Sequence, residues 1–313
     1  MAWSGRESAG SLRLVILFYS MSNNHRPGPG LAKRMIMNAV QIIFHNPVGA
    51  ALTGLSRILY PRNGGDWVDI NQIRLALPRL SPEFDGYQIA QISDFHFGTW
   101  LTSKELEHAV SLVNQQRVNL VAITGDFVTF HSEIFSNDLT SILSTLRASD
   151  GVVAVLGNHD HWSDPAEIRR IIKQANIREL NNDVYSLVRD NGRLHICGID
   201  DFMVGADRLD QVFQKLPNDG AAILLAHEPD FADISTLSKR FDLQISGHSH
   251  GGQIVLPLVG APILPSYARK YTSGLYQVDG MLQYTNRGLG TAEIQVRLNC
   301  RPEITVFTLE SVK

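Results

Sequence analysis

Short apolar runs alternate with helical segments along most of this chain, starting near residue 66. Runs of a length typical of buried strands lie at residues 87–92, 120–124, 152–156, 222–226 and 243–246. An earlier run at 70–77 ends before Pro78 and predicts an edge strand. Helices are predicted to begin near Thr102, Ser132 and Pro165. The alternation predicts an α/β fold.

The tail of the chain has a different pattern, because no helical period occurs after residue 252. Strands are predicted at residues 252–256, 275–278, 281–285, 292–298 and 303–309. The Val278-Asp279-Gly280-Met281 stretch indicates a hairpin. We expect two mixed sheets packed face to face with helices outside, and the tail strands completing the second sheet.

The first 60 residues form an appendage with two parts. Residues 1–30 are interpreted as a disordered lead-in, and an export signal is the less favoured alternative. Residues 31–60 have a basic start, and apolar residues recur at helical spacing from Val48 to Leu59. This amphipathic helical segment could pack on the protein's own core or lie in a membrane interface, and both interpretations stay open.

The charge balance and the cysteine content of the chain limit which partners and metal sites are expected. The chain has 313 residues, with 28 Lys and Arg against 31 Asp and Glu. A net charge of −3 gives no general basic field, so no nucleic-acid partner is expected. The two cysteines, Cys197 and Cys300, lie far apart in the sequence. They indicate neither a disulfide framework nor a thiolate metal site, and they fit a reducing compartment.

Five of the predicted strands end in residue types that bind metals. The five clusters are Asp94-Phe95-His96, Gly125-Asp126, Gly157-Asn158-His159-Asp160, His227 and Gly247-His248-Ser249-His250. Each alone is weak, since turns and helix caps use the same residues. Active sites of open α/β sheets form beyond the carboxyl ends of the strands, so five such clusters predict one shared crevice.

This set of motifs resembles the calcineurin-like metallophosphoesterase superfamily, whose pattern runs D-x-H, G-D, G-N-H-D/E, H, G-H-x-H. The surroundings, including Ile92 to Gly98, Leu225 to Asp230 and Asn286 to Thr291, resemble its bacterial YkuE/YaeI-like branch and chlamydial UDP-2,3-diacylglucosamine hydrolase. The resemblance covers about residues 66–309. It implies a four-layer α/β/β/α sandwich with an N-terminal helical appendage.

The resemblance also implies a dinuclear metal centre. It assigns one ion to Asp94, His96 and His250, and a second ion to Asn158, His227 and His248, with Asp126 bridging both. Two such ions, about 3.5–4 Å apart, need a shared carboxylate and share a bridging water or hydroxide, the nucleophile. Ligands without thiolate suit Mn, Fe or Zn. Manganese is the preferred expectation by family likeness.

His159 is left over from the ligand set, and the resemblance makes it the proton donor to the leaving oxygen. Asp160 is expected to orient a neighbouring histidine or backbone group. His161 is a candidate for lining the substrate pocket, with an exposed loop as its alternative. Arg287 is a candidate for binding phosphate, and a structural ion pair is the equal alternative.

The predicted function is metal-dependent hydrolysis of a phosphoester or pyrophosphate bond by a metal-bridging hydroxide. The predicted substrate is lipid-linked or a UDP-sugar, met by a cytoplasmic protein peripheral to the inner face of the plasma membrane. A nuclease or general phosphodiesterase of the same superfamily, and a non-catalytic scaffold with this fold, are the alternatives.

Overall fold

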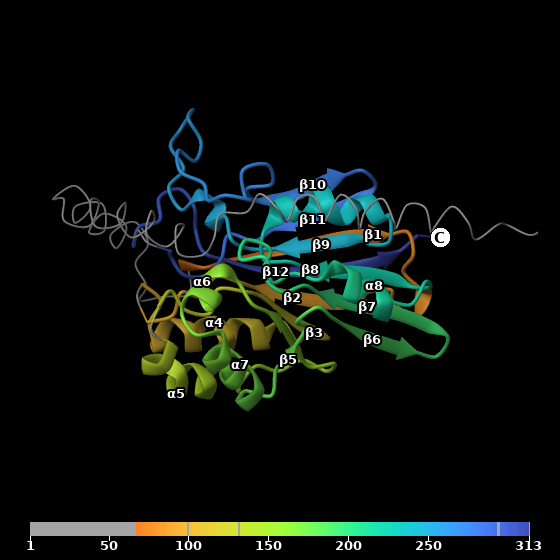
Figure 1. The fold of residues 1–313 in the computed structure, drawn as a ribbon, viewed down its shortest axis with the longest axis horizontal. Coiled ribbons are helices and arrows are strands. Elements are labelled where there is room, and N and C mark those ends of the chain that lie inside the picture. Colours follow the sequence, from red (N-terminus) through yellow and green to blue (C-terminus); the bar gives the residue numbers. More distant parts are fainter. Residues whose placement is uncertain (1–66, 99, 131, 293–294, 313) are drawn as a thin grey trace, which may run out of the picture.

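The computed structural model describes residues 67–98, 100–130, 132–292 and 295–312 (Figure 1). The lead-in predicted at 1–30 and the amphipathic segment predicted at 31–60 lie outside these ranges. Within them, no helix combines the length and apolar character that crossing a bilayer requires.

Two six-stranded sheets form the centre of the fold. The first sheet has the order β1 (Asp69–Leu77), β12 (Glu303–Ser311), β2 (Gln88–Ile92), β3 (Leu120–Thr124), β4 (Val152–Val155), β5 (Arg178–Glu179). The second has the order β10 (Gly274–Val278), β11 (Met281–Thr285), β9 (Leu243–Ser246), β8 (Ala221–Leu225), β7 (Gly192–Gly198), β6 (Asp183–Arg189). Both sheets are mixed, as predicted.

Helices cover the outer face of each sheet and complete the four layers (Figure 1). The first sheet carries α4 (Ser103–Gln115), α5 (Ser132–Leu143) and α7 (Pro165–Gln174), and the second carries α8 (Leu209–Lys215) and α9 (Ala232–Ser235). Short helical turns connect them: η3 (Pro82–Phe84), α6 (Asn158–Trp162), η4 (Pro229–Phe231), η5 (Thr236–Ser238) and η6 (His250–Gly252). The central core lies between the sheets, where side chains such as Ile89 and Leu120 meet Ile223 and Ile245. The predicted α/β/β/α sandwich is confirmed.

Local sequence signals set the helix starts. Thr102 and Glu105 form a capping box at the start of α4. Asp164 accepts hydrogen bonds from the amides of Ala166 and Glu167 at the start of α7, at 3.0 and 3.2 Å. The predicted helix starts are therefore confirmed.

The tail differs from the prediction in three places. Strand β12 does not join the second sheet: it lies between β1 and β2 in the first, parallel to β1 and antiparallel to β2. The predicted strand at 252–256 is wrong, since this segment makes only isolated bridges. Residues 295–297 are likewise not a strand, so the prediction for 292–298 fails over its described residues. The backbone there bonds in short turns and, at Leu298, between the two segments, without forming a strand ladder, which an apolar pattern alone does not reveal.

Candidate metal centre

The predicted clusters meet at one edge of the two sheets. Strands β2, β3 and β4 are parallel to one another, and so are β8 and β9, so each set has its carboxyl ends at one edge. The seven residues predicted as ligands follow these five strands directly and are all buried: Asp94, His96, Asp126, Asn158, His227, His248 and His250.

The side chains form two groups that share one carboxylate. Asp94, His96, Asp126 and His250 offer donor atoms within 4.8 Å of one another, and so do Asp126, His227 and His248. Asp126 belongs to both groups. Its Oδ2 lies 3.4 Å from His96 Nε2 and 3.1 Å from His227 Nε2. The structure thus contains a set of residues suited to a dinuclear metal site.

Hydrogen bonds fix which nitrogen of each imidazole faces the centre. His227 donates from Nδ1 to the Thr124 carbonyl at 2.7 Å, so Nε2 is the nitrogen that faces Asp126. His248 is reversed: its Nε2 donates to the Ser266 carbonyl at 2.9 Å, so Nδ1 is the free nitrogen. Because a carbonyl oxygen can only accept, these contacts select the tautomer that a metal requires.

The backbone of most cluster residues is not extended. Five of the seven residues have φ between +44° and +68°: Asp94, His96, Asp126, His248 and His250. Non-glycine residues rarely occupy this region, and such strain gathers at functional sites. The side chains of Asp94 and His96, and of His248 and His250, therefore do not converge through the alternation of an extended strand.

Two motif glycines are required by close approach to the carboxylates. A Cβ at Gly157 would lie 2.3 Å from Asp126 Oδ1, and one at Gly247 would lie 2.3 Å from Asp94 Oδ2. A side chain at either position would displace an acidic residue of the cluster.

The charges of the cluster suit a cation. Burial raises the pKa of Asp94, and the nearby Asp126 carboxylate adds to the rise. Burial also lowers the pKa of His250 well below its usual value, helped by His96 and Arg297, and keeps its imidazole neutral. Buried carboxylates in repulsion and a neutral imidazole are the electrostatic state that bound divalent ions stabilise.

One buried atom without a hydrogen-bond partner tests independently whether the cluster fits a metal ion. Asn158 Oδ1 is buried and has no hydrogen-bond partner. A buried amide oxygen left unpaired costs free energy, and a metal ion would satisfy it. Together with imidazole nitrogens and carboxylate oxygens, it gives an oxygen and nitrogen donor set without sulfur, which fits Mn, Fe or Zn.

Asp160 holds the backbone of the cluster rather than a histidine. Its carboxylate accepts hydrogen bonds from the amides of Asp126, Phe127 and Gly157, at 2.9, 2.8 and 2.9 Å. Asp160 thereby joins the loop after β3 to the turn after β4. Of the two expected roles, the backbone one is observed.

His159 lies at the rim of the cluster. Its ring packs edge-on against His96 and Trp162, with centroids 4.7 and 4.8 Å apart. Its amide donates to Asp126 Oδ1 at 2.9 Å, so the shared carboxylate also positions this residue. His159 remains beside the centre without belonging to either donor group.

The two candidate substrate residues have protein partners. His161 Nε2 lies 2.7 Å from Asp200 Oδ1, and Arg169 holds the other Asp200 oxygen at 3.0 Å. Arg287 donates to the carboxylates of Glu303 and Asp69. For Arg287, this is the structural ion pair considered as its alternative.

Arg297 was not identified from the sequence, yet its guanidinium is fully buried behind the cluster. Its Nη2 donates to the carbonyls of Arg287 and Gly290 and lies 3.4 Å from His250 Nδ1. An arginine in a tail strand pattern gives no sign of burial, so no sequence signal identifies it.

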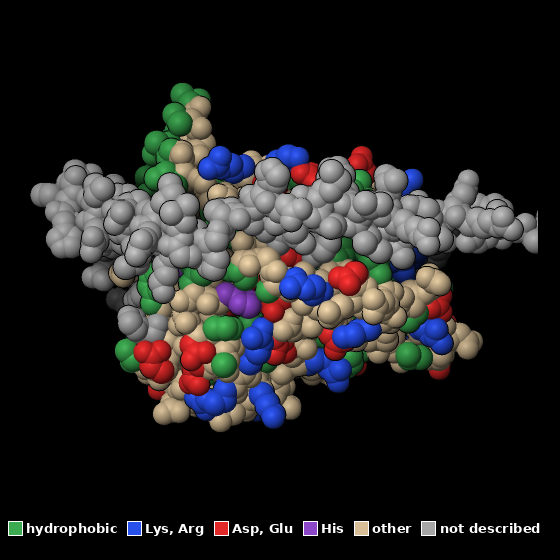
Figure 2. Space-filling view, viewed as in Figure 1, with side chains coloured by type: hydrophobic (Ala, Val, Ile, Leu, Met, Phe, Trp, Pro, Cys, Tyr) green, Lys and Arg blue, Asp and Glu red, His purple; other side chains and the backbone are tan. Residues whose placement is uncertain are grey.

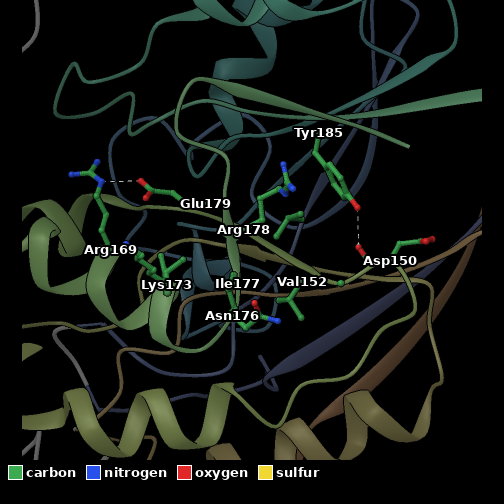
Figure 3. A pocket seen from close by; sticks show the side chains of 12 residues that line it. Asp150, Val152, Arg169, Lys173, Asn176, Ile177, Arg178, Glu179 and Tyr185 are labelled. Carbon is green, nitrogen blue, oxygen red and sulfur yellow. Dashed lines mark hydrogen bonds and ion pairs between the residues drawn. The ribbon is translucent and has the colours of Figure 1, made fainter. Parts of the chain in front are cut away.

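A surface cavity of about 600 Å³ lies apart from this centre, between β4, β5 and α7 (Figure 3). Asp150, Arg169, Lys173, Arg178 and Tyr185 are among its lining residues. None of the lining residues belongs to the two donor groups. The cavity is therefore separate from the two donor groups.

Comparison with known proteins agrees with the geometry. Residues 87–252 match the family model described as calcineurin-like phosphoesterase. Metallophosphoesterase YkuE of Bacillus subtilis is 34% identical over 232 residues, which cover 73% of this chain and 80% of YkuE. Phosphodiesterase YaeI of Escherichia coli is 29% identical over 247 residues, 78% of this chain and 88% of YaeI. With these matches and its buried Asp and His cluster, the chain belongs to the calcineurin-like phosphoesterase family and is a metal-dependent phosphoester hydrolase.

Proposed function

We propose that the chain hydrolyses a phosphoester or pyrophosphate bond at two divalent ions held by the seven cluster residues. The observation that carries this proposal is the position of Asp126, whose Oδ2 faces His96 on one side and His227 on the other. Asp94, His96 and His250 would hold one ion, Asn158, His227 and His248 the other, and Asp126 both. When bound, such a pair polarises the phosphoryl oxygens and lowers the pKa of water.

In the proposed reaction, His159 moves a proton to the leaving oxygen. Its backbone amide donates to the shared carboxylate, and its ring packs against His96 of the cluster. Trp162 packs against the ring and restricts its rotation. Histidine is the side chain most often used to transfer a proton to a leaving group.

For the metal we propose manganese, which the thiolate-free donor set accommodates. For the substrate we propose a lipid-linked or UDP-sugar phosphoester met at a membrane surface, within a catalytic domain at about residues 66–309. A diester is favoured over a monoester because YaeI carries the name phosphodiesterase.

Replacing the shared carboxylate tests the proposal. Asp126→Asn keeps the shape and one oxygen acceptor for the His159 amide but removes the charge. We expect both ions, measured by elemental analysis, and hydrolysis of bis(p-nitrophenyl) phosphate with Mn²⁺ to be lost together. Asp150→Asn, outside the centre, is the control. Two ions per chain in the Asp126 variant would overturn the assignment.

The substrate class needs a separate measurement. Wild-type protein loaded with Mn²⁺ would be assayed against a monoester, a diester and UDP-2,3-diacylglucosamine. We expect kcat/KM to be highest for the UDP-sugar lipid. A higher value for a soluble monoester would contradict the proposed substrate without affecting the metal assignment.

A further inference from the structure

An apolar loop projects from the molecule next to the metal centre. It follows η6 and runs over residues 254–265, and from 251 to 268 the chain has no charged side chain. Figure 2 shows hydrophobic side chains gathered on a protrusion at the top of the molecule, and Figure 1 places this segment of the chain there. We call residues 254–265 the apolar loop.

The tip of this loop exposes large aliphatic side chains. Leu258 is 108% exposed, Val259 70% and Ile263 62%, and Leu256 is also exposed. Scattered single hydrophobic residues on a surface are ordinary, but these four lie within eight positions of one another on one projection. Such a gathering indicates an interaction surface.

The tip is a closed turn rather than a loose segment. Leu256 and Gly260 exchange backbone hydrogen bonds, each at 2.9 Å, and Val259 donates to the Leu256 carbonyl. Leu258 has φ of +66°, a strained value for leucine. The chain thus keeps a large apolar side chain in a strained position at the point most exposed to water, and strain of this kind marks functional segments.

Both ends of the apolar loop are attached to the metal centre. It begins four residues after His250, and its last residue precedes Ser266, whose carbonyl accepts the hydrogen bond from His248 Nε2. The base of the apolar loop is therefore fixed to the metal centre.

The small size of the apolar tip favours a lipid surface over a protein partner. A stable protein interface buries about 800 Å² and 20–30 residues on each side, which a four-residue tip cannot supply. A few aliphatic side chains are enough to insert into the headgroup and acyl boundary. At the base, Arg269 and Lys270 are offset by Asp230, which accepts both of their amides, and by Asp233, which pairs with Lys270. We therefore expect little dependence on anionic lipid.

We propose that the apolar loop inserts its tip, Leu256 to Val259 with Ile263, into a lipid bilayer and so places the metal centre at the membrane surface. Insertion itself does not depend on hydrolysis. The use of an amphiphilic substrate rests on the function proposed above.

A fluorescent label at the tip tests insertion in the full chain. The Leu258→Cys variant would carry an environment-sensitive dye, and Cys197 and Cys300 are buried and leave the label selective. With phosphatidylcholine vesicles, we expect a blue shift and quenching by lipids with a quencher on the acyl chain. The same dye on Val188→Cys, at an exposed position on β6, should not respond.

Partitioning gives a second measurement. Val259→Asp should lower the vesicle partition coefficient about tenfold or more, whereas Val188→Asp should leave it unchanged. A tip label that stays in water, or equal partitioning of Val259→Asp and wild type, would overturn the proposal. So would a blue shift that appears without vesicles and grows with protein concentration, because it would show that a second copy covers the tip.

The two proposals fail separately. Val259→Asp should hydrolyse bis(p-nitrophenyl) phosphate at the wild-type rate, and Asp126→Asn should insert into vesicles like wild type. If the wild-type protein hydrolyses this ester but does not insert into vesicles, the result contradicts only the membrane proposal.

Discussion

The carboxylate of Asp160 holds the backbone of Asp126: Asp160 Oδ2 accepts the Asp126 amide at 2.9 Å, while Asp126 itself adopts a φ of +56°. The same Oδ2 accepts the Gly157 amide at 2.9 Å, which brings the turn that contains Asn158 toward the shared carboxylate. One buried acidic side chain thus positions residues of two strand ends.

Asp160→Asn should therefore weaken metal binding without removing a ligand. In the variant, an NH2 group replaces one carboxylate oxygen and faces backbone amides that also donate. We therefore expect the affinity for Mn²⁺, measured by calorimetry, to fall about 10- to 100-fold. Asp164→Asn is a matched control, because Asp164 also accepts backbone amides but caps α7. Equal metal affinity in both variants would show that the Asp160 hydrogen bonds do not position the ligands.

His159→Asn should separate catalysis from metal binding. We expect kcat to fall about 10²-fold, the scale of a lost acid, while two ions per chain remain. His161→Asn, whose side chain pairs with Asp200, should have a kcat near wild type. If His159→Asn keeps the wild-type kcat, His159 is not the proton donor.

Arg297→Gln should destabilise the fold as well as the centre. The variant leaves the carbonyls of Arg287 and Gly290 without their donor, and a buried unpaired group costs about 1–3 kcal/mol each. We expect a loss of about 3 kcal/mol in urea unfolding. Arg301→Gln, at an exposed position, should cost less than about 1 kcal/mol. Similar losses in the two variants would contradict the buried role.

Asp207 should make stability depend on pH. Burial and the charge of Glu228 raise the pKa of Asp207 to about 8, above its ordinary value of 3.8. Between these values the folded state keeps a proton that the unfolded state releases. Its contribution to the free energy of unfolding is therefore greatest below pH 3.8 and decreases as the pH rises toward about 8.

Urea unfolding at pH 5 and pH 8 measures this contribution. From pH 5 to pH 8, the free energy of unfolding of Asp207→Asn should fall by less than that of wild type. The difference between the two decreases should exceed about 1.4 kcal/mol, the equivalent of one pKa unit. Asp219→Asn, at an exposed position, should behave like wild type. A slope in Asp207→Asn as steep as in wild type would show that another group titrates.

Residue type and order within the sequence determined the family, the alternation of strands and helices, and the place where the seven cluster residues meet. The last follows because sites of open α/β sheets form beyond the carboxyl ends of the strands. Capping residues such as Asp164 set helix starts through bonds made within a few positions. These are local properties, and local sequence encodes them.

Only the tertiary structure decided the rest, because it depends on contacts between distant residues. The strand β12 pairs with β1 across more than 200 positions, and its apolar pattern suits either sheet. Arg297 becomes a buried donor because carbonyls of another turn surround it. The strained φ values of Asp94, Asp126 and His250 persist only because packing and hydrogen bonds hold them in place.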